Sequence, residues 1–173
     1  SYGFASLPAF FGTHRELPLF LLFFAGFGIK AGFIPFHTWL PDAHPSAPSH
    51  VSALMSGVMI KMGIYGIFRV ISTVQHDFLT IGIFILVISL LTGIYGVLQA
   101  IVQHDLKKLL AYHSIENIGI IGTGIGLGCI GLAMHHSELA LLGFGGGLLH
   151  VLNHSLFKSL LFFAAGNVYN ATG

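Results

Sequence analysis

Five long apolar runs, separated by short polar breaks, constrain the fold of this sequence more than any other feature. A bilayer-spanning helix needs roughly 20 mostly apolar residues, and each run is long enough to supply one. Composition points the same way, because 54% of the residues are hydrophobic and only 8% are charged, too few for a soluble surface. We therefore expect an all-α, polytopic transmembrane helix bundle. The predicted spans are 17–36, 51–71, 78–102, 109–133 and 139–166.

The breaks between the runs are too short to hold further domains, so neighbouring helices should pack antiparallel in a single transmembrane domain over residues 1–173. The run 78–102 carries no charge and is expected to be lipid-facing scaffold. Small residues four positions apart allow close helix contact. Four alternating glycines follow this rule: Gly122, Gly124, Gly126 and Gly128. Cys129 lies in the same stretch and is expected to pack there. The sequence opens without a methionine and is expected to be a fragment of a larger protein.

Prolines are concentrated where the first run ends and the connection 37–50 begins. Proline lacks a backbone donor and disrupts a helix interior, so we expect the first span to end in one broken or half-length helix. Four residues form the expected hinge: Gly28, Gly32, Pro35 and Pro41. Broken helices in transporters expose carbonyls and helix ends that solvate an ion inside the membrane. The alternative is that 37–50 forms a proline-rich surface loop.

Three lysines lie inside predicted spans: Lys30, Lys61 and Lys158. A charge near the bilayer centre costs about 2.5–3.5 kcal/mol on insertion scales, and intramembrane charges usually mark ion pathways. The formal net charge is +1 and the basic residues are scattered, so the chain has no basic stripe to follow a nucleic-acid backbone. Moving ions is the function that these lysines favour.

The fifth run places His150, His154 and Lys158 at positions i, i+4 and i+8, on one helical face that we call the His/Lys face. Imidazole accepts and donates protons near neutral pH, and a buried lysine can alternate between charged and neutral forms. The pattern therefore predicts a proton path through intervening water. Three alternatives stay open: a zinc site, which needs a further ligand from elsewhere; a haem site between two helices; and hydrogen bonds that only hold helices together.

Glu116 is the only carboxylate deep in an apolar run. Such an acid is expected to pair with a lysine or to carry protons itself. At the start of the same run, Asp105 is a suitable N-cap. That cap would let Lys107 point into the bundle. The alternative is a Lys107 side chain that extends to the water interface.

Three segments resemble successive signatures of the proton-antiporter-like membrane subunits shared by respiratory complex I, Mrp antiporters and membrane-bound hydrogenases. The segments are Gly28–Arg69, Asp105–Ile121 and Leu152–Gly166. Residues 116–119 (ENIG) and 153–162 resemble the hydrogenase-4 and formate hydrogenlyase branch more than the NADH dehydrogenase branch. The resemblance covers nearly the whole chain beyond Leu17. It implies a fragment of a larger subunit built from two inverted repeats, each with a broken helix.

The resemblance also implies roles for individual residues. Lys30 is expected to pair with a glutamate on an earlier helix that this sequence does not contain. Lys61 and Lys107 are expected to relay protons toward the second half of the subunit, and the His/Lys face is expected to lead them toward an exit. Glu116 stands where other branches often carry a different polar residue, so its role in the pathway is the least specified.

The function that the resemblance implies is proton translocation in a redox-driven, respiratory-type complex, in which redox chemistry in a partner separates the Lys30 ion pair. The chain has no CxxC pair, iron–sulfur ligand set or GxGxxG fingerprint, so no cofactor is expected in it. Ni–Fe, iron–sulfur or flavin centres are expected in a peripheral redox arm, beside other membrane subunits in a prokaryotic cytoplasmic membrane. The alternatives are an Mrp-type Na⁺/H⁺ antiporter subunit and a haem-binding membrane anchor. The coupling ion, the stoichiometry and the orientation stay open.

Overall fold

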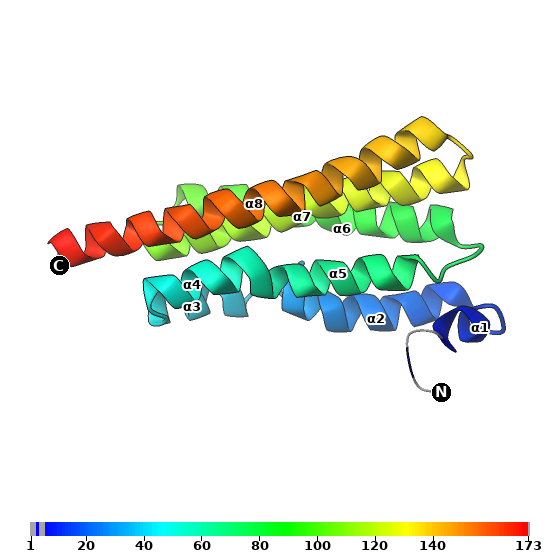
Figure 1. The fold of residues 1–173 in the computed structure, drawn as a ribbon, viewed down its shortest axis with the longest axis horizontal. Coiled ribbons are helices and arrows are strands. Elements are labelled where there is room, and N and C mark those ends of the chain that lie inside the picture. Colours follow the sequence, from blue (N-terminus) through cyan, green and yellow to red (C-terminus); the bar gives the residue numbers. More distant parts are fainter. Residues whose placement is uncertain (1–2, 4–5, 173) are drawn as a thin grey trace.

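The computed structural model describes Gly3 and residues 6–172, and all regular secondary structure in that part of the chain is helical. Figure 1 shows the helices running side by side along one long axis. The predicted fold class, an all-α transmembrane bundle, is confirmed. The elements are α1 (Leu7–Phe11), α2 (Glu16–Ala31), α3 (Trp39–Ser46), α4 (Ser49–Leu54), the π-helical turn η2 (Met55–Met59), α5 (Ile60–Ile71), α6 (Phe78–Ile101), α7 (Leu106–Ala133) and α8 (Ser137–Thr172).

Four continuous helices in the described residues are long and apolar enough to cross a membrane. They are Ser49–Ile71, which joins α4, η2 and α5, and the helices α6, α7 and α8. The predicted bounds agree closely with all of them except at the end of α8, which continues past Gly166. Its 36 residues at about 1.5 Å each make a helix roughly 54 Å long. This length exceeds the ~30 Å hydrocarbon core of a bilayer.

The first predicted span ends earlier than expected. α2 stops at Ala31 and not at Phe36, because Gly32 adopts a left-handed conformation with a φ of 88° and caps the helix. Its N–H donates to the carbonyl oxygen of Gly28 at 2.8 Å. A Cβ at position 32 would lie 2.2 Å from the side chain of Leu40. Both the backbone conformation and the space therefore require glycine at this turn.

Beyond the turn the chain forms α3, which packs against α7 inside the bundle. The connection 37–50 is therefore part of a broken helix and not a surface loop. Pro41 is tolerated because it stands in the first turn of α3, where a backbone N–H has no partner within the helix. Pro35 lies in the turn between α2 and α3.

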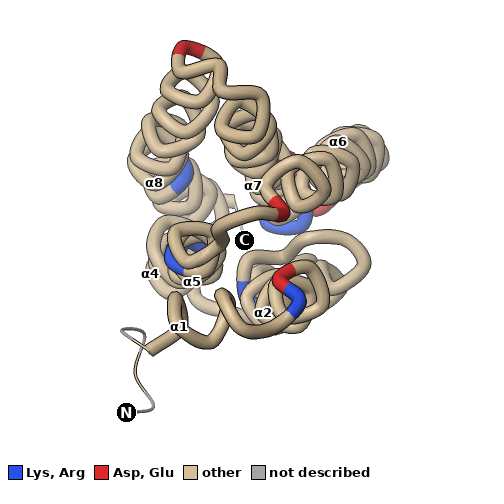
Figure 2. The backbone as a smooth tube through the Cα atoms, turned by 90° about the vertical axis from the view of Figure 1, so that its right-hand side faces the viewer, with Lys and Arg blue, Asp and Glu red and all other residues tan. Residues whose placement is uncertain are grey.

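Alternating glycines allow α7 to pack closely on two helices at once, as predicted. A Cβ on Gly126 would lie 2.8 Å from the backbone nitrogen of Leu86 in α6, and a Cβ on Gly124 would lie 2.8 Å from the carbonyl oxygen of Gly143 in α8. Successive glycines thus serve opposite neighbours. Figure 2 shows the result, with α7 lying between α6 and α8. Cys129 is fully buried in this packing.

α6 has a buried inner face and an exposed outer face. Its buried positions follow helical spacing through Ile81, Ile85, Ser89 and Thr92. Its outer face is apolar and exposed, with Leu79, Ile83, Val87, Leu90, Leu91, Ile94 and Leu98. An apolar outer face fits contact with lipid or with another membrane subunit. The buried lysines lie on other helices, namely α7, α8 and the α4–α5 helix.

Candidate functional site

The His/Lys face of α8 points into the bundle. His154 and Lys158 expose 0% and 1% of their surface, and His150 is half-buried. The same face of α8 carries three small residues that allow it to approach α7. They are Ala140, Gly143 and Gly147. The imidazole rings of His150 and His154 lie nearly parallel, with centroids 6.3 Å apart. The predicted spacing therefore does bring the three side chains onto one inward face.

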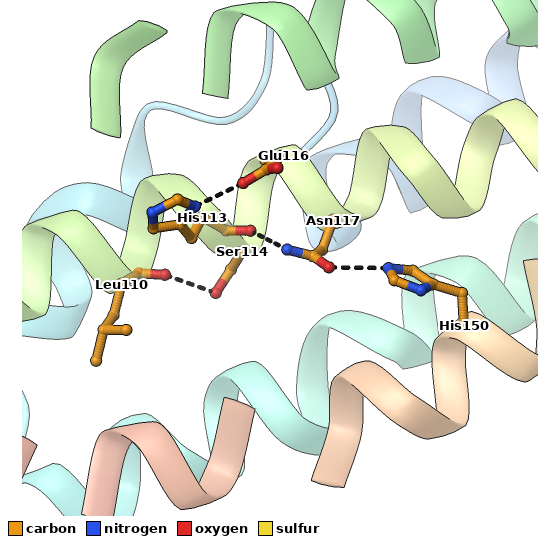
Figure 3. Close-up of polar contacts among 6 residues, drawn as sticks. All are labelled: Leu110, His113, Ser114, Glu116, Asn117 and His150. Carbon is orange, nitrogen blue, oxygen red and sulfur yellow. Dashed lines mark hydrogen bonds and ion pairs between the residues drawn. The ribbon is translucent and has the colours of Figure 1, made fainter. Parts of the chain in front are cut away.

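Asn117 of α7 links this face to its neighbour, as Figure 3 shows. Its amide nitrogen Nδ2 donates to the backbone oxygen of His113 at 2.7 Å, so its Oδ1 is left to accept. That oxygen lies 2.8 Å from Nε2 of His150. Because an amide oxygen can only accept, His150 carries a proton on Nε2. Its Nδ1 is then the basic nitrogen when the ring is neutral.

His154 is buried without a hydrogen bond. Neither Nδ1 nor Nε2 has a partner among the described residues, and the ring of Phe157 lies 5.3 Å away. An unsatisfied buried polar group costs about 1–3 kcal/mol. One alternative was that the histidines only hold helices together through hydrogen bonds. That alternative does not explain His154, because His154 makes no hydrogen bond to another described residue.

Lys61 approaches the same region from the α4–α5 helix and is 8% exposed. Its Nζ donates to the backbone oxygen of Ser56, which belongs to the π-helical turn η2. The Ser56 hydroxyl meets the hydroxyl of Ser114 in α7 at 2.9 Å. Ser114 donates to the oxygen of Leu110, so Ser56 donates to Ser114. Lys61 and Lys158 interact electrostatically across this interior. The π turn thus ties the lysine to α7.

Lys107 points inward, which is one of the two orientations that the sequence left open. The Asp105 side chain accepts the N–H of Lys108 at 2.8 Å, which confirms the cap. The Nζ of Lys107 donates to the oxygen of Ala47 at 2.9 Å, immediately after α3, and lies 5.4 Å from the ring centre of Tyr169. The Lys107 ammonium group there is attracted by the partial negative charge at the C-terminal end of α3.

His44 of α3 is a site residue that the sequence analysis missed. It is fully buried, stacks on Phe162 with centroids 4.6 Å apart, and has no hydrogen-bond partner for either ring nitrogen among the described residues. It interacts electrostatically with Lys61, Lys107 and Lys158. The signal was available in the i, i+4 spacing of Leu40 and His44, but only once 39–46 is known to be helical.

The structure leaves Lys30 outside this group, and Glu116 makes no direct contact with it, although Glu116 interacts electrostatically with His150 and Lys158. Lys30 is exposed in the last turn of α2. Glu116 pairs with His113 at 2.6 Å and not with a lysine, because His113 lies three residues before it on the same helix. The described residues contain no cluster of three His, Cys, Asp or Glu side chains that would hold a metal ion.

Residues 6–173 match the transmembrane family described as NADH:quinone oxidoreductase/Mrp antiporter. The chain belongs to this family. Two relatives within it come from Escherichia coli. Hydrogenase-4 component B is 48% identical over 153 residues, which cover 87% of the chain and 23% of that protein. Formate hydrogenlyase subunit 3 is 44% identical, with 99% of the chain and 29% of that protein covered. The resemblance to this branch of the NADH:quinone oxidoreductase/Mrp antiporter family is confirmed.

A solved structure agrees with the family assignment. The chain superposes with a TM-score of 0.85 and 32% identity on a chain from the membrane-bound sulfane sulfur reductase, an archaeal respiratory membrane complex, covering 100% of this chain and 29% of that one. The chain thus spans about a quarter of the length of the NADH:quinone oxidoreductase/Mrp antiporter family members that it matches. It is an integral membrane segment of a larger fold.

Proposed function

We propose that this chain is part of a proton-translocating membrane subunit of a redox-driven complex of the hydrogenase-4 and formate hydrogenlyase kind. One observation carries the proposal: three buried, ionisable side chains from three helices, Lys61, His44 and Lys158, lie close enough to interact electrostatically. Intramembrane charges are costly and usually functional. His154, also fully buried, interacts with both lysines.

This group of buried lysines and histidines is better suited to passing a proton on than to holding it. Lys61 and Lys158 interact electrostatically, and two ammonium groups in a low-dielectric interior repel, so a proton that arrives on one lysine favours release from the other. His44 and His154 interact electrostatically with both lysines, and each can accept a proton on one ring nitrogen while losing one from the other. Their unbonded nitrogens support a relay role. The Ser56–Ser114 hydroxyl pair holds the turn that positions Lys61.

Lys30 enters this scheme as the residue that receives the driving signal. We propose that it pairs with a carboxylate outside the present chain, because an exposed lysine at the end of α2 leaves its ammonium free to meet another helix. Redox chemistry in partner subunits would weaken that pair and send charge toward Lys61. Ni–Fe, iron–sulfur or flavin centres are proposed for a peripheral arm, with other membrane subunits beside this one. The bacterial relatives support a prokaryotic cytoplasmic membrane as the location.

The test is proton uptake by the complete complex reconstituted in vesicles, measured per electron transferred. Lys61→Met is expected to abolish most of the uptake, because it removes a titrating group from the interior. Lys108→Met is the matched control, since Lys108 follows Lys107 in α7 but is only half-buried. Uptake unchanged in Lys61→Met would reject the proposal.

A sodium-coupled antiporter is the second candidate, because the matched family includes Mrp antiporters. Uptake measured with and without Na⁺ separates the two functions. A haem-binding anchor has less support, since the Nε2–H of His150 is already donated to Asn117 and no such function is part of the family description.

A further inference from the structure

Glu116 and His113 form an acid–base pair that the buried group does not use. The Glu116 Oε2 atom lies 2.6 Å from Nδ1 of His113, and the two side chains are 23% and 41% exposed. Figure 3 shows this pair leaving α7 in one direction, while the neighbouring Asn117 leaves it in another, toward His150 on α8. One turn of α7 therefore faces both the interior and the outer side of the bundle.

A groove of about 350 Å³ lies beside Glu116, between α6 and α7. The two helices approach closely beside it: a Cβ on Gly96 would lie 2.5 Å from the backbone nitrogen of Glu116, and a Cβ on Gly119 would lie 2.4 Å from that of Gly93. The walls include the exposed apolar side chains Leu90, Ile94 and Leu98. Among the residues that line this groove, Glu116 is the only charged one.

The pair is also coupled to the interior. Glu116 interacts electrostatically with His150 and with Lys158, both on α8. α7 contributes His113 as its direct partner, and α6 contributes no Asp, Glu, Lys, Arg or His at all. The nearest titratable side chain from α6 known to contact α7 is Tyr95, whose ring centre lies 6.4 Å from that of Tyr112. A charge lost or gained at Glu116 is therefore felt chiefly by His113 and by α8.

We propose that the His113–Glu116 pair is a lateral protonation site, which exchanges protons on the α6/α7 side of the bundle and thereby sets the charge seen by His150 and Lys158. The inference rests on the proposed function for its consequence, but not for the site itself. The step is a proton transfer along one hydrogen bond: neutral Glu116 and neutral His113 become carboxylate and imidazolium, and the reverse. When Glu116 is protonated, its negative charge no longer attracts the protons on His150 and Lys158, and their release becomes more favourable.

The site is tested first without any transport. A hydrophobic carbodiimide reaches carboxylic acids from the apolar side of a membrane; the acid adds across one C=N bond, its proton moves to nitrogen, and an N-acylurea forms by acyl shift. We expect mass spectrometry of the labelled native complex to find this adduct on Glu116. Because only the protonated acid reacts, labelling should fall as the pH is raised. A water-soluble carbodiimide should instead label Glu138, which is exposed in the first turn of α8.

Absence of the adduct on Glu116 at every pH, with Glu138 labelled normally by the soluble reagent, would overturn the lateral site. This result is independent of transport, so it is distinguishable from failure of the proposed function. The second arm measures proton uptake in the complete complex. Glu116→Gln is expected to slow uptake several-fold and His113→Asn to shift its pH profile, whereas Glu138→Gln should change neither. Labelling at Glu116 combined with unchanged uptake and an unchanged pH profile in both variants would reject the coupling to α8.

Discussion

The Nε2 atom of His150 on α8 donates a hydrogen bond to Oδ1 of Asn117 on α7, at 2.8 Å. The direction is set by the other end of the amide, which donates to the backbone oxygen of His113. One neutral side chain on α7 therefore determines which nitrogen of His150 can accept a proton. The proton path that we propose along α8 therefore depends on a residue of a different helix.

Replacing Asn117 tests this dependence. Asn117→Leu removes the acceptor and is expected to cost about 0.6 kcal/mol of stability and at most about 1.7 kcal/mol, the range for hydrogen bonds between membrane helices. Proton uptake by the complete complex should fall more than this small loss explains, because His150 loses its fixed tautomer. Ser155→Ala is the control, since that hydroxyl bonds only within α8, to the oxygen of Val151 at 2.8 Å. Equal uptake in the two variants would contradict the account.

Close packing of α7 on α8 predicts a position-dependent effect of adding one methyl group. Gly124→Ala is expected to lower stability by about 1–3 kcal/mol, because its Cβ would meet the backbone of Gly143 and overpacking of this kind has that cost. Gly145→Ala is the matched control, because nothing lies within 4 Å of a Cβ there. Thermal unfolding of the full-length subunit in detergent measures both. A control as unstable as Gly124→Ala would show that helix approach is not the cause.

Glu16 lies at the start of α2, outside the long spans. The hydrogen bonds that its carboxylate accepts should make the stability of the fold depend on pH. Burial alone would raise the pKa of its carboxyl, but the backbone N–H groups of His76, Asp77 and Gln75, at 2.8, 3.0 and 2.8 Å, outweigh burial and lower it. A lowered folded pKa stabilises the fold above the ordinary pKa of about 4.3 and loses that effect as pH falls through the lowered value.

Glu16→Gln should therefore be less stable than the natural protein at neutral pH, and the difference should shrink on acidification. Thermal unfolding across the acidic range measures it. Glu138→Gln, an exposed position, should show no such gap. A gap that stays constant into strong acid would mean that the charge of Glu16 is not what the backbone N–H groups stabilise.

The helical spacing of residues in the sequence was enough to predict much of the fold and part of the candidate site. The i, i+4, i+8 spacing of the His/Lys face sufficed to predict that it lies on one side of α8, and Asp105 identified the start of α7. Both are local properties of a regular helix. The close contacts of Gly124 and Gly126 followed for the same reason, since small residues at fixed spacing define a helix surface whichever neighbour covers it.

Irregular segments were harder to predict. Gly32 ends α2 five residues before the apolar pattern does, because a left-handed residue stops a helix whatever the hydropathy of the residues that follow. α3 was read as a connection because it contains Pro41 and Pro45, so the inward position of His44 was missed. Glu116 was expected either to pair with a lysine or to carry protons itself, and its pairing with His113 of the same helix was not foreseen. Such pairings depend on rotamers and neighbours that spacing alone does not determine.

If the buried lysines work by losing and regaining protons, a cation that keeps its proton at position 158 should stop transport, and Lys158→Arg supplies such a cation. Arginine keeps the positive charge of this fully buried position but does not release its proton in proteins. In the complete complex, reconstituted in vesicles, the account predicts that proton uptake per electron is lost in Lys158→Arg, while the subunit still assembles. Uptake at the natural ratio in that variant would show that Lys158 acts only as a fixed charge, and would contradict the account.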